Sequence, residues 1–520
     1  MNAWQSLTRR VAVATGPLRS VRSASAQAQV KVEDVEVRPF SEVPRPGKLQ
    51  FMRSFMPGGE FSEASVFDFS MVMRQRYGDI FVQPGMFGRK DTVVTYSTSD
   101  IATVFRNEGA WPRRETFDSI VYFREHIRPD VYGYSLGLAT AQAEDWGKIR
   151  SAVNPIFMQP KGLQMYFEPL SNINNEFIER IKEIRDPRTL EVPANFVDEL
   201  QRLIFESLNL IAFDRQTGII RRNRDNPDAL TLFRTSRDIL SYSFKLDMQP
   251  SMWKLVSTPT YRKMMRTLNE SLDVAQRFLA ESQQVLEERR KAGEQVSGSS
   301  MLQRLLAIDP KLALIIGLDI LFAGVDATAT LLSAVLLTLA LHPAKQQKLR
   351  EELLKIMPTK ESLLSEDTMK DMPYLRAVIK ETLRYYPNGL GTMRTCPDNV
   401  TLSGYNVPKG TPVLLAANAM MKDPAYYPQP EEFLPERWLR DPQSGKRQQV
   451  SPPFTFLPFG FGPRQCIGKR VVDLEVETSV AKLIRNFQVE FLHDASKPYK
   501  TLFVMQPAID FRFKFTDLPE

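Results

Sequence analysis

The residues with the clearest chemical signal lie near the end of the chain, in FGFGPRQCIG at residues 459–468. Their glycines and prolines predict a tight turn, and the apolar residues that follow at helical spacing predict a helix. Cys466 then lies at a helix N-terminus, where N–H groups and the dipole favour an anionic sulfur. A lone cysteine is more often a small buried hydrophobe. The fixed pattern of Phe, Gly, Arg, Cys and Gly instead favours a thiolate ligand for haem iron.

This loop resembles the haem-binding loop of the cytochrome P450 superfamily, F-x-x-G-x-R-x-C-x-G. The resemblance runs from about residue 36 to the C-terminus and implies one haem-thiolate monooxygenase domain over residues 36–520. It implies a mainly α fold with a smaller β region, and heme b (iron protoporphyrin IX) as cofactor. Cys466 would be the axial ligand of the iron, and Phe459 would also lie at the cofactor.

Two further motifs match the family. The helix expected over residues 373–387 carries Glu381 and Arg384 on one face, three residues apart. Such a pair is usually a surface ion pair of little energetic worth. In the family, however, this E-x-x-R pair joins the arginine of a later P-x-R motif, here Arg437, and we expect a buried triad that helps retain haem.

The resemblance also assigns the haem propionates. Trp146 and Arg150 form W-x-x-x-R at helical spacing, and the family places these two residues at a propionate. Arg394, in GTMRT, and Arg464, two residues before the cysteine, would donate charge-assisted hydrogen bonds to the propionates.

A long apolar helix is predicted over residues 310–341, with Asp309 as N-cap and Pro310 as first helical residue. At 1.5 Å per residue it would be roughly 48 Å long, enough to span a membrane. Asp319 and Asp326 argue against a span. We therefore expect a buried central helix with a functional kink, in which Gly324 lets a ligand approach the backbone.

Within this helix, Ala323 to Thr328 read AGVDAT, which resembles the oxygen-binding motif A/G-G-x-D/E-T-T/S of the family. Asp326 takes the position of the acid that helps deliver protons. Ala327 replaces the usual threonine, and Thr328 lies about 100° further round the helix. Three alternatives remain: a water or substrate hydroxyl completes the proton path, Thr328 does so through a local distortion, or the protein does not activate dioxygen.

The first 32 residues contain five Lys or Arg residues, several serines and no acid. This composition predicts a mitochondrial presequence over residues 1–32 and a matrix location, although a disordered basic arm would look similar. Without these residues, 63 of the 68 basic residues remain against 61 acids. The balance is close to neutral, which argues against a nucleic-acid partner.

Four basic residues could still form a local docking surface: Arg376, Lys380, Lys469 and Arg470. Mitochondrial members of the family carry basic residues at matching positions, where an adrenodoxin-type ferredoxin delivers electrons from an NADPH-dependent reductase. An ordinary solvated face is the alternative. The sequences AGVDAT and PFGFGPRQCIG most resemble those of the insect mitochondrial branch of the family, family 12.

By resemblance, the substrate pocket would be walled by residues 114–134, 240–255, 388–393 and 502–505 and the helix around Phe322. These segments suit a lipophilic xenobiotic or steroid-like molecule. Met248, Met252 and Trp253 would touch the inner mitochondrial membrane or line the pocket. The substrate and its site of oxidation do not follow from the sequence.

Smaller signals complete the prediction. Residues 400–415 read as a hairpin with turns at Gly404 and Gly410, and residues 293–300 as a loop. Cys396 and Cys466 are expected to stay reduced. Ala327 also leaves open a haem-thiolate isomerase or dehydratase that needs no electrons, and a non-catalytic haem-binding protein is a further alternative.

Overall fold

The long apolar helix expected from the sequence is α13, Pro310–Leu341, in the computed structural model of the chain. The Asp309 side chain caps it by accepting the N–H of Leu312 at 2.9 Å. We expected a kink, but the structure gives an uninterrupted α-helix. Among the described residues, α13 alone is long and apolar enough to cross a membrane, yet 78% of its apolar window is buried inside the protein. The prediction of a buried central helix is confirmed.

The structure describes residues 37–520, apart from 294–298, 442, 446–451, 503 and 520. Arg38–Glu520 forms one compact unit. The predicted presequence, residues 1–32, and most of the predicted loop at residues 293–300 lie outside the described residues.

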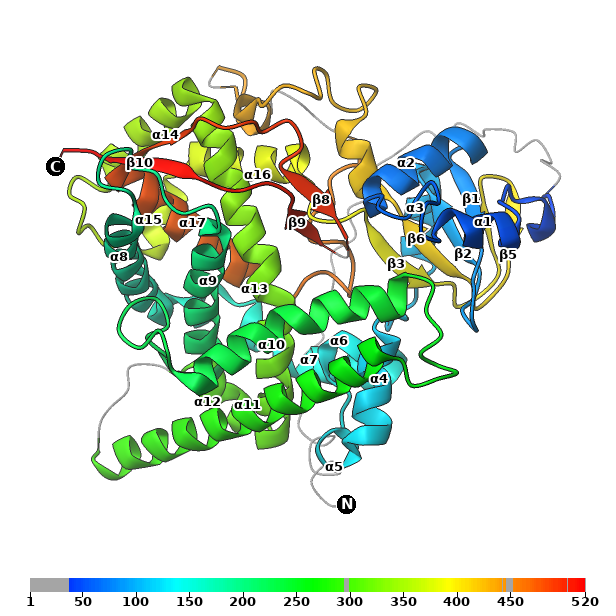
Figure 1. Cartoon of the computed structure of the whole chain (residues 1–520), viewed down its shortest axis with the longest axis horizontal. Helices are drawn as coiled ribbons and strands as arrows, with labels where there is room; N and C mark the ends of the chain where they lie inside the picture. Colours follow the sequence, from blue (N-terminus) through cyan, green and yellow to red (C-terminus); the bar gives the residue numbers. More distant parts are fainter. Residues whose placement is uncertain (1–36, 294–298, 442, 446–451, 503, 520) are drawn as a thin grey trace, which may run out of the picture. The chain divides into compact units, whose positions relative to one another are not determined.

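Helices make up most of this unit, which confirms the mainly α fold (Figure 1). The α-helices are α1 (Lys48–Ser54), α2 (Val66–Tyr77), α3 (Thr98–Arg106), α4 (Asp118–Tyr122), α5 (Pro129–Tyr132), α6 (Gly137–Thr140), α7 (Ala143–Phe157), α8 (Phe167–Ile184), α9 (Phe196–Phe213), α10 (Pro227–Ser243), α11 (Pro259–Lys291), α12 (Met301–Leu306), α13, α14 (Pro343–Ile356), α15 (Glu366–Lys370), α16 (Pro373–Tyr385) and α17 (Lys469–Asn486). Short 3-10 turns are η2 (Phe40–Glu42), η4 (Pro160–Tyr166), η6 (Ala417–Lys422) and η7 (Pro435–Trp438), and π-helical turns are η3 (Phe123–Ile127) and η5 (Phe244–Met248).

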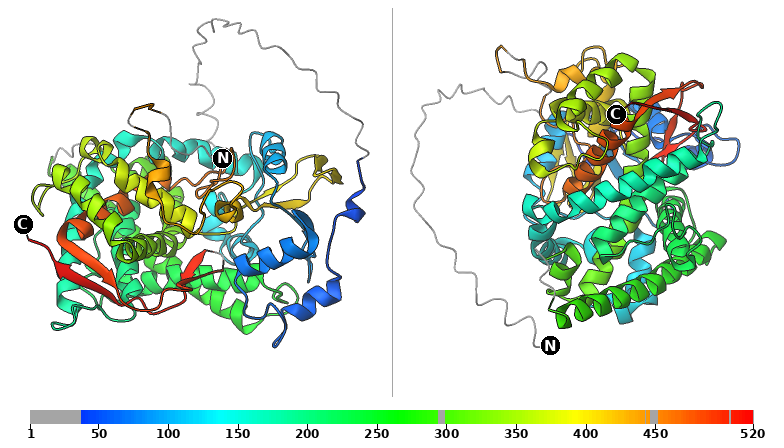
Figure 2. Two further views of the ribbon diagram at one scale, coloured as in Figure 1. Left: turned by 90° about the horizontal axis from the view of Figure 1, so that it is seen from above. Right: turned by 90° about the vertical axis from the view of Figure 1, so that its left-hand side faces the viewer.

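The strands form small sheets, the largest of which lies to one side of the helices in Figure 1 and in the left view of Figure 2. They are β1 (Ile80–Gln83), β2 (Thr92–Thr95), β3 (Thr392–Thr395), β4 (Val400–Leu402), β5 (Tyr405–Val407), β6 (Pro412–Leu415), β7 (Phe487–Phe491), β8 (Tyr499–Thr501), β9 (Met505–Pro507) and β10 (Phe513–Asp517). The largest sheet has the order β1-β2-β6-β3, with β2 and β6 parallel and the other pairs antiparallel. Antiparallel pairs β4–β5, β7–β10 and β8–β9 complete the β region.

The predicted hairpin is correct at its first turn. Ser403 and Gly404 both have positive φ, 47° and 80°, and connect β4 to β5. Gly410, also with φ 80°, turns the chain as expected. The strand that follows, β6, does not extend this hairpin but joins the larger sheet beside β3.

Close packing of α13 against α9 explains Gly324. A Cβ atom at this position would lie 2.7 Å from the Leu208 Cδ1 atom of α9. The missing side chain therefore makes room for a neighbouring helix, where we had expected it to make room for a ligand.

Candidate active site

The cysteine loop, residues 459–468, is shaped by glycines and by its own backbone hydrogen bonds. Gly460 and Gly462 have φ of 72° and 73°, a region that residues with a Cβ atom rarely adopt. The Cys466 N–H donates to the Phe459 carbonyl at 2.9 Å. Helix α17 begins at Lys469, so Cys466 precedes its N-terminus as the sequence predicts.

The Cys466 side chain remains accessible, although it lies deep among protein atoms. Burial is the largest influence on its thiol and raises the pKa. The Gly468 N–H and the guanidinium groups of Arg150 and Arg114 act in the opposite direction and favour the thiolate. Cys396 and Cys466 form no disulfide with each other in the structure.

Four arginines from separate segments gather at this loop, one of them within it: Arg114, Arg150, Arg394 and Arg464. Burial, followed by repulsion from the other three, lowers the pKa of Arg464 to about 8. Burial and the repulsion of Arg394 and Arg150 lower the pKa of Arg114 to about 10, against the attraction of Cys466. We call these four residues the arginine cluster.

Loop carbonyls and an aromatic ring hold Arg464 in place. Its Nε donates to the Pro112 carbonyl and one Nη to the Ala141 carbonyl, both at 2.9 Å. Its guanidinium lies 4.0 Å from the ring centroid of Trp146, which is itself buried. These contacts fix the orientation of the Arg464 guanidinium.

Arg394 is held by Glu108, which lies just after α3. The two side chains form a buried ion pair, and Arg394 also donates to the Phe461 carbonyl of the cysteine loop at 2.9 Å. Burial raises the pKa of Glu108 despite the neighbouring arginines. This acid was not predicted as a site residue.

The arginine cluster contains more donors than the described protein groups accept. Arg114 Nε, Arg150 Nε and Arg464 Nη1 are buried and have no hydrogen-bond partner. Glu108 is the carboxylate that opposes them in the described part of the chain. Unpaired buried cations are costly, so the cluster fits a ligand with two carboxylates, and the two propionates of haem match this requirement.

One face of α13 is accessible within the fold. Ala323 is exposed, and Ile320, Gly324 and Ala327 are half-buried, although most of the helix around them is buried. This spacing places all four on one face. Thr328 is 1% exposed, its hydroxyl has no hydrogen-bond partner, and the helix around it is regular. The local distortion that would bring Thr328 to this face is not present.

Asp326 is buried on a different side of α13, where α9 and α10 supply its partners. Gln201 Nε2 donates to Asp326 Oδ1 at 2.8 Å, and Arg237 Nε lies 3.8 Å from the same oxygen. Burial raises the pKa of Asp326, while Arg237 opposes this shift. Arg237 also pairs with the partly exposed Asp198 at 3.1 Å. A chain of charged groups thus connects Asp326 with the surface.

The structure brings the predicted triad together in the interior. Glu381 accepts hydrogen bonds from Arg384 at 2.9 and 3.0 Å and from Arg437 at 3.0 Å. Trp438 Nε1 and the Leu434 N–H also donate to this carboxylate, at 2.8 and 3.0 Å. Glu381 and Arg384 are fully buried and Arg437 is 7% exposed. The carboxylate ties α16 to η7 and to the segment before it.

The four predicted docking cations differ in their surroundings. Lys380 and Arg470 are exposed. Arg376 and Lys469 already pair with carboxylates of α17, at 3.5 and 2.5 Å. Helices α16 and α17 pack against each other, so the four cations lie on two adjacent helices.

The predicted pocket walls partly converge. A cavity of about 20 Å³ is lined by Ile120 and Arg124, by Ser236 of α10 and by Phe322 of α13. The cavity also touches α11, an element that we did not predict as a wall. At another wall, Asn388 donates to the Ala327 carbonyl at 3.4 Å and accepts the Met505 N–H at 3.1 Å.

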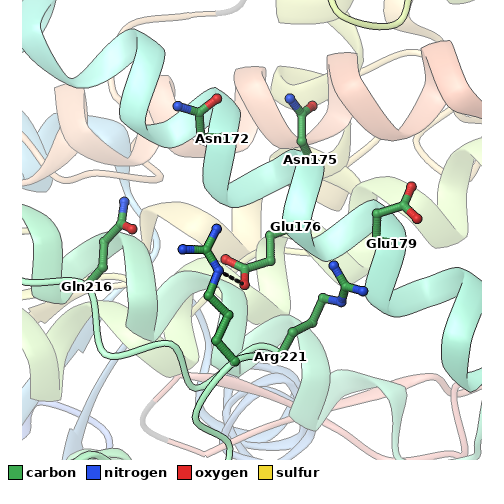
Figure 3. A pocket seen from close by; sticks show the side chains of 7 residues that line it. Asn172, Asn175, Glu176, Glu179, Gln216 and Arg221 are labelled. Carbon is green, nitrogen blue, oxygen red and sulfur yellow. Dashed lines mark ion pairs between the residues drawn. The ribbon is translucent and has the colours of Figure 1, made fainter.

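A larger depression of about 480 Å³ lies elsewhere, between α8 and the loop after α9 (Figure 3). Its lining is polar and includes an ion pair between Arg222 and Glu176 at 3.1 Å. It contains none of the predicted site residues, so we do not assign it to the active site.

Comparison with known proteins agrees with this geometry. The family model described as cytochrome P450 matches residues 44–515. The chain therefore belongs to the cytochrome P450 family: it is a haem-thiolate monooxygenase whose cofactor is haem b.

Comparison with individual relatives identifies the branch of the cytochrome P450 family to which the chain belongs. The chain is 70% identical over 518 residues to probable cytochrome P450 12d1 proximal, mitochondrial, of Drosophila melanogaster, with 99% of each chain covered. It is 40% identical over 513 residues to cytochrome P450 CYP12A2 of Musca domestica, with 97% of this chain and 96% of the relative covered. The protein is a mitochondrial member of family 12, which confirms the predicted branch and the predicted mitochondrial localisation, though not its matrix side.

Proposed function

We propose that the protein hydroxylates a lipophilic small molecule in the mitochondrial matrix, using dioxygen and electrons from an adrenodoxin-type ferredoxin and its NADPH-dependent reductase. The observation that carries this proposal is the accessible Cys466 beside the arginine cluster with its unpaired donors. The matrix side rests on the composition of residues 1–32, which would act as a presequence.

The cofactor would be held by two sets of residues. Cys466 would ligate the iron, with Phe459 beside it in the cysteine loop. Trp146 and the arginine cluster would hold the propionates, Arg114 being an addition to the predicted set. Bound haem would supply the redox chemistry that inserts one oxygen atom of dioxygen into a C–H bond.

Asp326 would hold and move the proton that oxygen activation requires. Its raised pKa lets the buried carboxyl carry a proton. Arg237 and Asp198 connect it with the surface, from which the proton is replaced. Because Ala327 offers no hydroxyl on the accessible face of α13 and Thr328 is buried away from it, a water or a substrate hydroxyl completes the path.

The ferredoxin would dock over α16 and the start of α17. Lys380 and Arg470 are the exposed cations that an acidic partner would meet first. Arg376 and Lys469, which pair with carboxylates of α17, lie on the same two helices and would add to the attraction.

The loop between α10 and α11 would contact the inner membrane. Met248, Met252, Leu255 and Val256 are between 37% and 69% exposed. Trp253, which we had considered for this contact, is 7% exposed and donates its indole N–H to the Leu246 carbonyl at 3.0 Å. It belongs to the interior of the loop.

Two measurements test this function. The reduced carbon-monoxide difference spectrum of the protein without residues 1–32 should show the strongly red-shifted band of a haem thiolate, and Cys466→Ala should lose it. Substrate oxidation should then require NADPH, reductase and ferredoxin together. Turnover without electrons would instead support the isomerase or dehydratase that Ala327 leaves open, and haem binding without turnover of any screened substrate would favour a haem-binding protein.

A further inference from the structure

Two of the predicted docking cations have carboxylate partners that differ in their access to water. Arg376 Nε of α16 lies 3.5 Å from Glu477 Oε1 of α17, and the Glu477 side chain is only 11% exposed. Lys469 pairs with Asp473, whose side chain is 35% exposed. If the cation leaves, water can solvate the carboxylate of Asp473, but the carboxylate of Glu477 stays largely shielded from water.

The guanidinium of Arg376 is accessible to a second carboxylate. Its Nη1 and Nη2 atoms donate to the Lys370 and Met369 carbonyls of α15, and its Nε faces Glu477. The side chain is 36% exposed. A guanidinium has five N–H donors, so a carboxylate that arrives from solvent can bind Arg376 and compete with Glu477 for it.

For Glu477, burial and Arg376 act in opposite directions. Burial has the largest influence and raises the pKa of Glu477 to about 7. Arg376 gives the strongest attraction that favours the carboxylate, Lys469 acts in the same direction, and Asp473 opposes both. Arg376 is the one ion-pair partner of Glu477 in the part of the chain that the structure describes.

Other acids near this pair do not share its situation. Glu352 of α14 interacts with Arg376 but accepts the backbone N–H groups of Tyr374 and Leu375, at 2.8 and 2.9 Å. Glu475, two residues before Glu477, lies on the opposite side of α17, since two residues turn a helix by about 200°. The carboxylate of Glu477 is thus the group whose charge depends on Arg376.

Loss of Arg376 to a partner would change the state of Glu477. A buried carboxylate without a cation is costly, whereas a protonated carboxyl group is neutral. The cost is avoided when the Glu477 carboxylate binds a proton from water at the moment at which its cation is taken over.

We propose that docking of the ferredoxin transfers Arg376 from Glu477 to an acidic side chain of the partner, and that Glu477 takes up a proton from solvent in exchange. This inference rests on the proposed function, because it concerns the ferredoxin surface over α16 and α17. It makes the affinity for the electron donor depend on pH.

The direction of this dependence follows from the exchange. Docking removes the group that favours the charged form, so it raises the pKa of Glu477 above its value of about 7 in the free protein. The docked state then holds more protons than the free state. Its stability is fully present below about pH 7 and falls as the pH rises.

Titration calorimetry of the haem-loaded protein with an adrenodoxin-type ferredoxin tests the exchange. Measurements in phosphate and in Tris, which have different ionisation enthalpies, count the protons taken up on docking. At about pH 8 the unaltered protein should take up roughly half a proton or more beyond the uptake of Glu477→Gln. Its Kd should also rise roughly tenfold more between about pH 7 and about pH 8.5 than the Kd of Glu477→Gln.

Two further variants separate the exchange from a general effect of charge. Asp473→Asn is the matched control, because it removes an exposed carboxylate from the same helix. It should bind ferredoxin more tightly at every pH and keep the proton uptake. Arg376→Gln leaves Glu477 without its cation before docking, so it should bind ferredoxin more weakly and lose the proton uptake. This variant makes the comparison without a change at the buried carboxyl.

Equal proton uptake by the unaltered protein, Glu477→Gln and Arg376→Gln would overturn the exchange, as would loss of the uptake in Asp473→Asn. Ferredoxin that binds and supports turnover without this uptake would refute the exchange and leave the proposed function intact. A haem-loaded protein that binds no ferredoxin at any pH would refute the proposed electron donor and the exchange with it.

Discussion

Replacement of Glu381 by Gln should abolish stable haem binding without touching any group that contacts substrate. The change keeps the size of the side chain but removes the charge that two buried arginines share. An amide also turns an NH₂ group toward donors that now point at a carboxylate oxygen. Removal of one partner from a buried ion pair costs about 3–5 kcal/mol of stability. This is a large part of the roughly 5–15 kcal/mol by which a typical domain is stable.

The matched control is Glu436→Gln, because Glu436 lies two residues before Trp438 in the same η7 turn. Glu436 accepts from Lys345 and Lys348 at 2.8 and 2.9 Å, and these lysines, acting against its partial burial, lower its pKa to about 2. Because the group is 27% exposed and water can solvate the lysines that remain, its loss should destabilise the fold less than loss of Glu381 and should leave the haem content unchanged. The assay is the ratio of reduced carbon-monoxide absorbance to protein, with thermal unfolding of the same samples.

Glu381→Gln should show little haem and a melting temperature several degrees lower, and Glu436→Gln should resemble the unaltered protein. If Glu381→Gln retains its full haem content and unfolds at the same temperature, the buried triad does not stabilise the haem-binding core, and the reasoning from its hydrogen bonds fails.

Three further perturbations have defined outcomes. Ala327→Thr should lower the peroxide released per NADPH consumed in a ferredoxin-supported assay, since it places a hydroxyl on the accessible face of α13; unchanged release would contradict our account of the missing threonine. Lys380→Glu combined with Arg470→Glu should raise the apparent KM for ferredoxin roughly tenfold at low salt, with a smaller effect at high salt and normal haem content. Burial raises the pKa of Asp247 to about 7, so the folded chain retains a proton that the unfolded chain releases near pH 4. The free energy of unfolding should therefore fall as the pH rises from about 4 to 7 relative to Asp247→Asn, and a pH-independent difference would exclude this shift.

Local signals in the sequence were sufficient to predict where two helices of the site begin. The cap and proline at Asp309 and Pro310 predicted the start of α13, and the glycines around Cys466 predicted a turn before α17. The apolar composition of α13 allowed either a core helix or a membrane span, and the two buried acids favoured the core helix. In the structure both acids have partners.

Long-range pairings could not be predicted in this way. Glu108 pairs with Arg394, 286 residues away, and a single acid in a loop has no periodic pattern to reveal it. The space beside Gly324 looked suitable for a ligand, because the sequence does not show that Leu208 of α9 fills it. The hydrogen bonds between Ser119 and Asp247, 128 residues apart, could not be predicted for the same reason.

The arginine cluster has a consequence for the order of assembly. Repulsion among four guanidinium groups would make closure of this region unfavourable until a dianion neutralises them, so under the proposed assignment this region would complete its folding only when the haem propionates arrive. A newly made chain would keep this end of the interior open to solvent and complete it on haem arrival. Maturation would then distinguish haem from neutral flat molecules of similar size before any chemistry begins. Only haem carries the negative charge that would neutralise the arginine cluster.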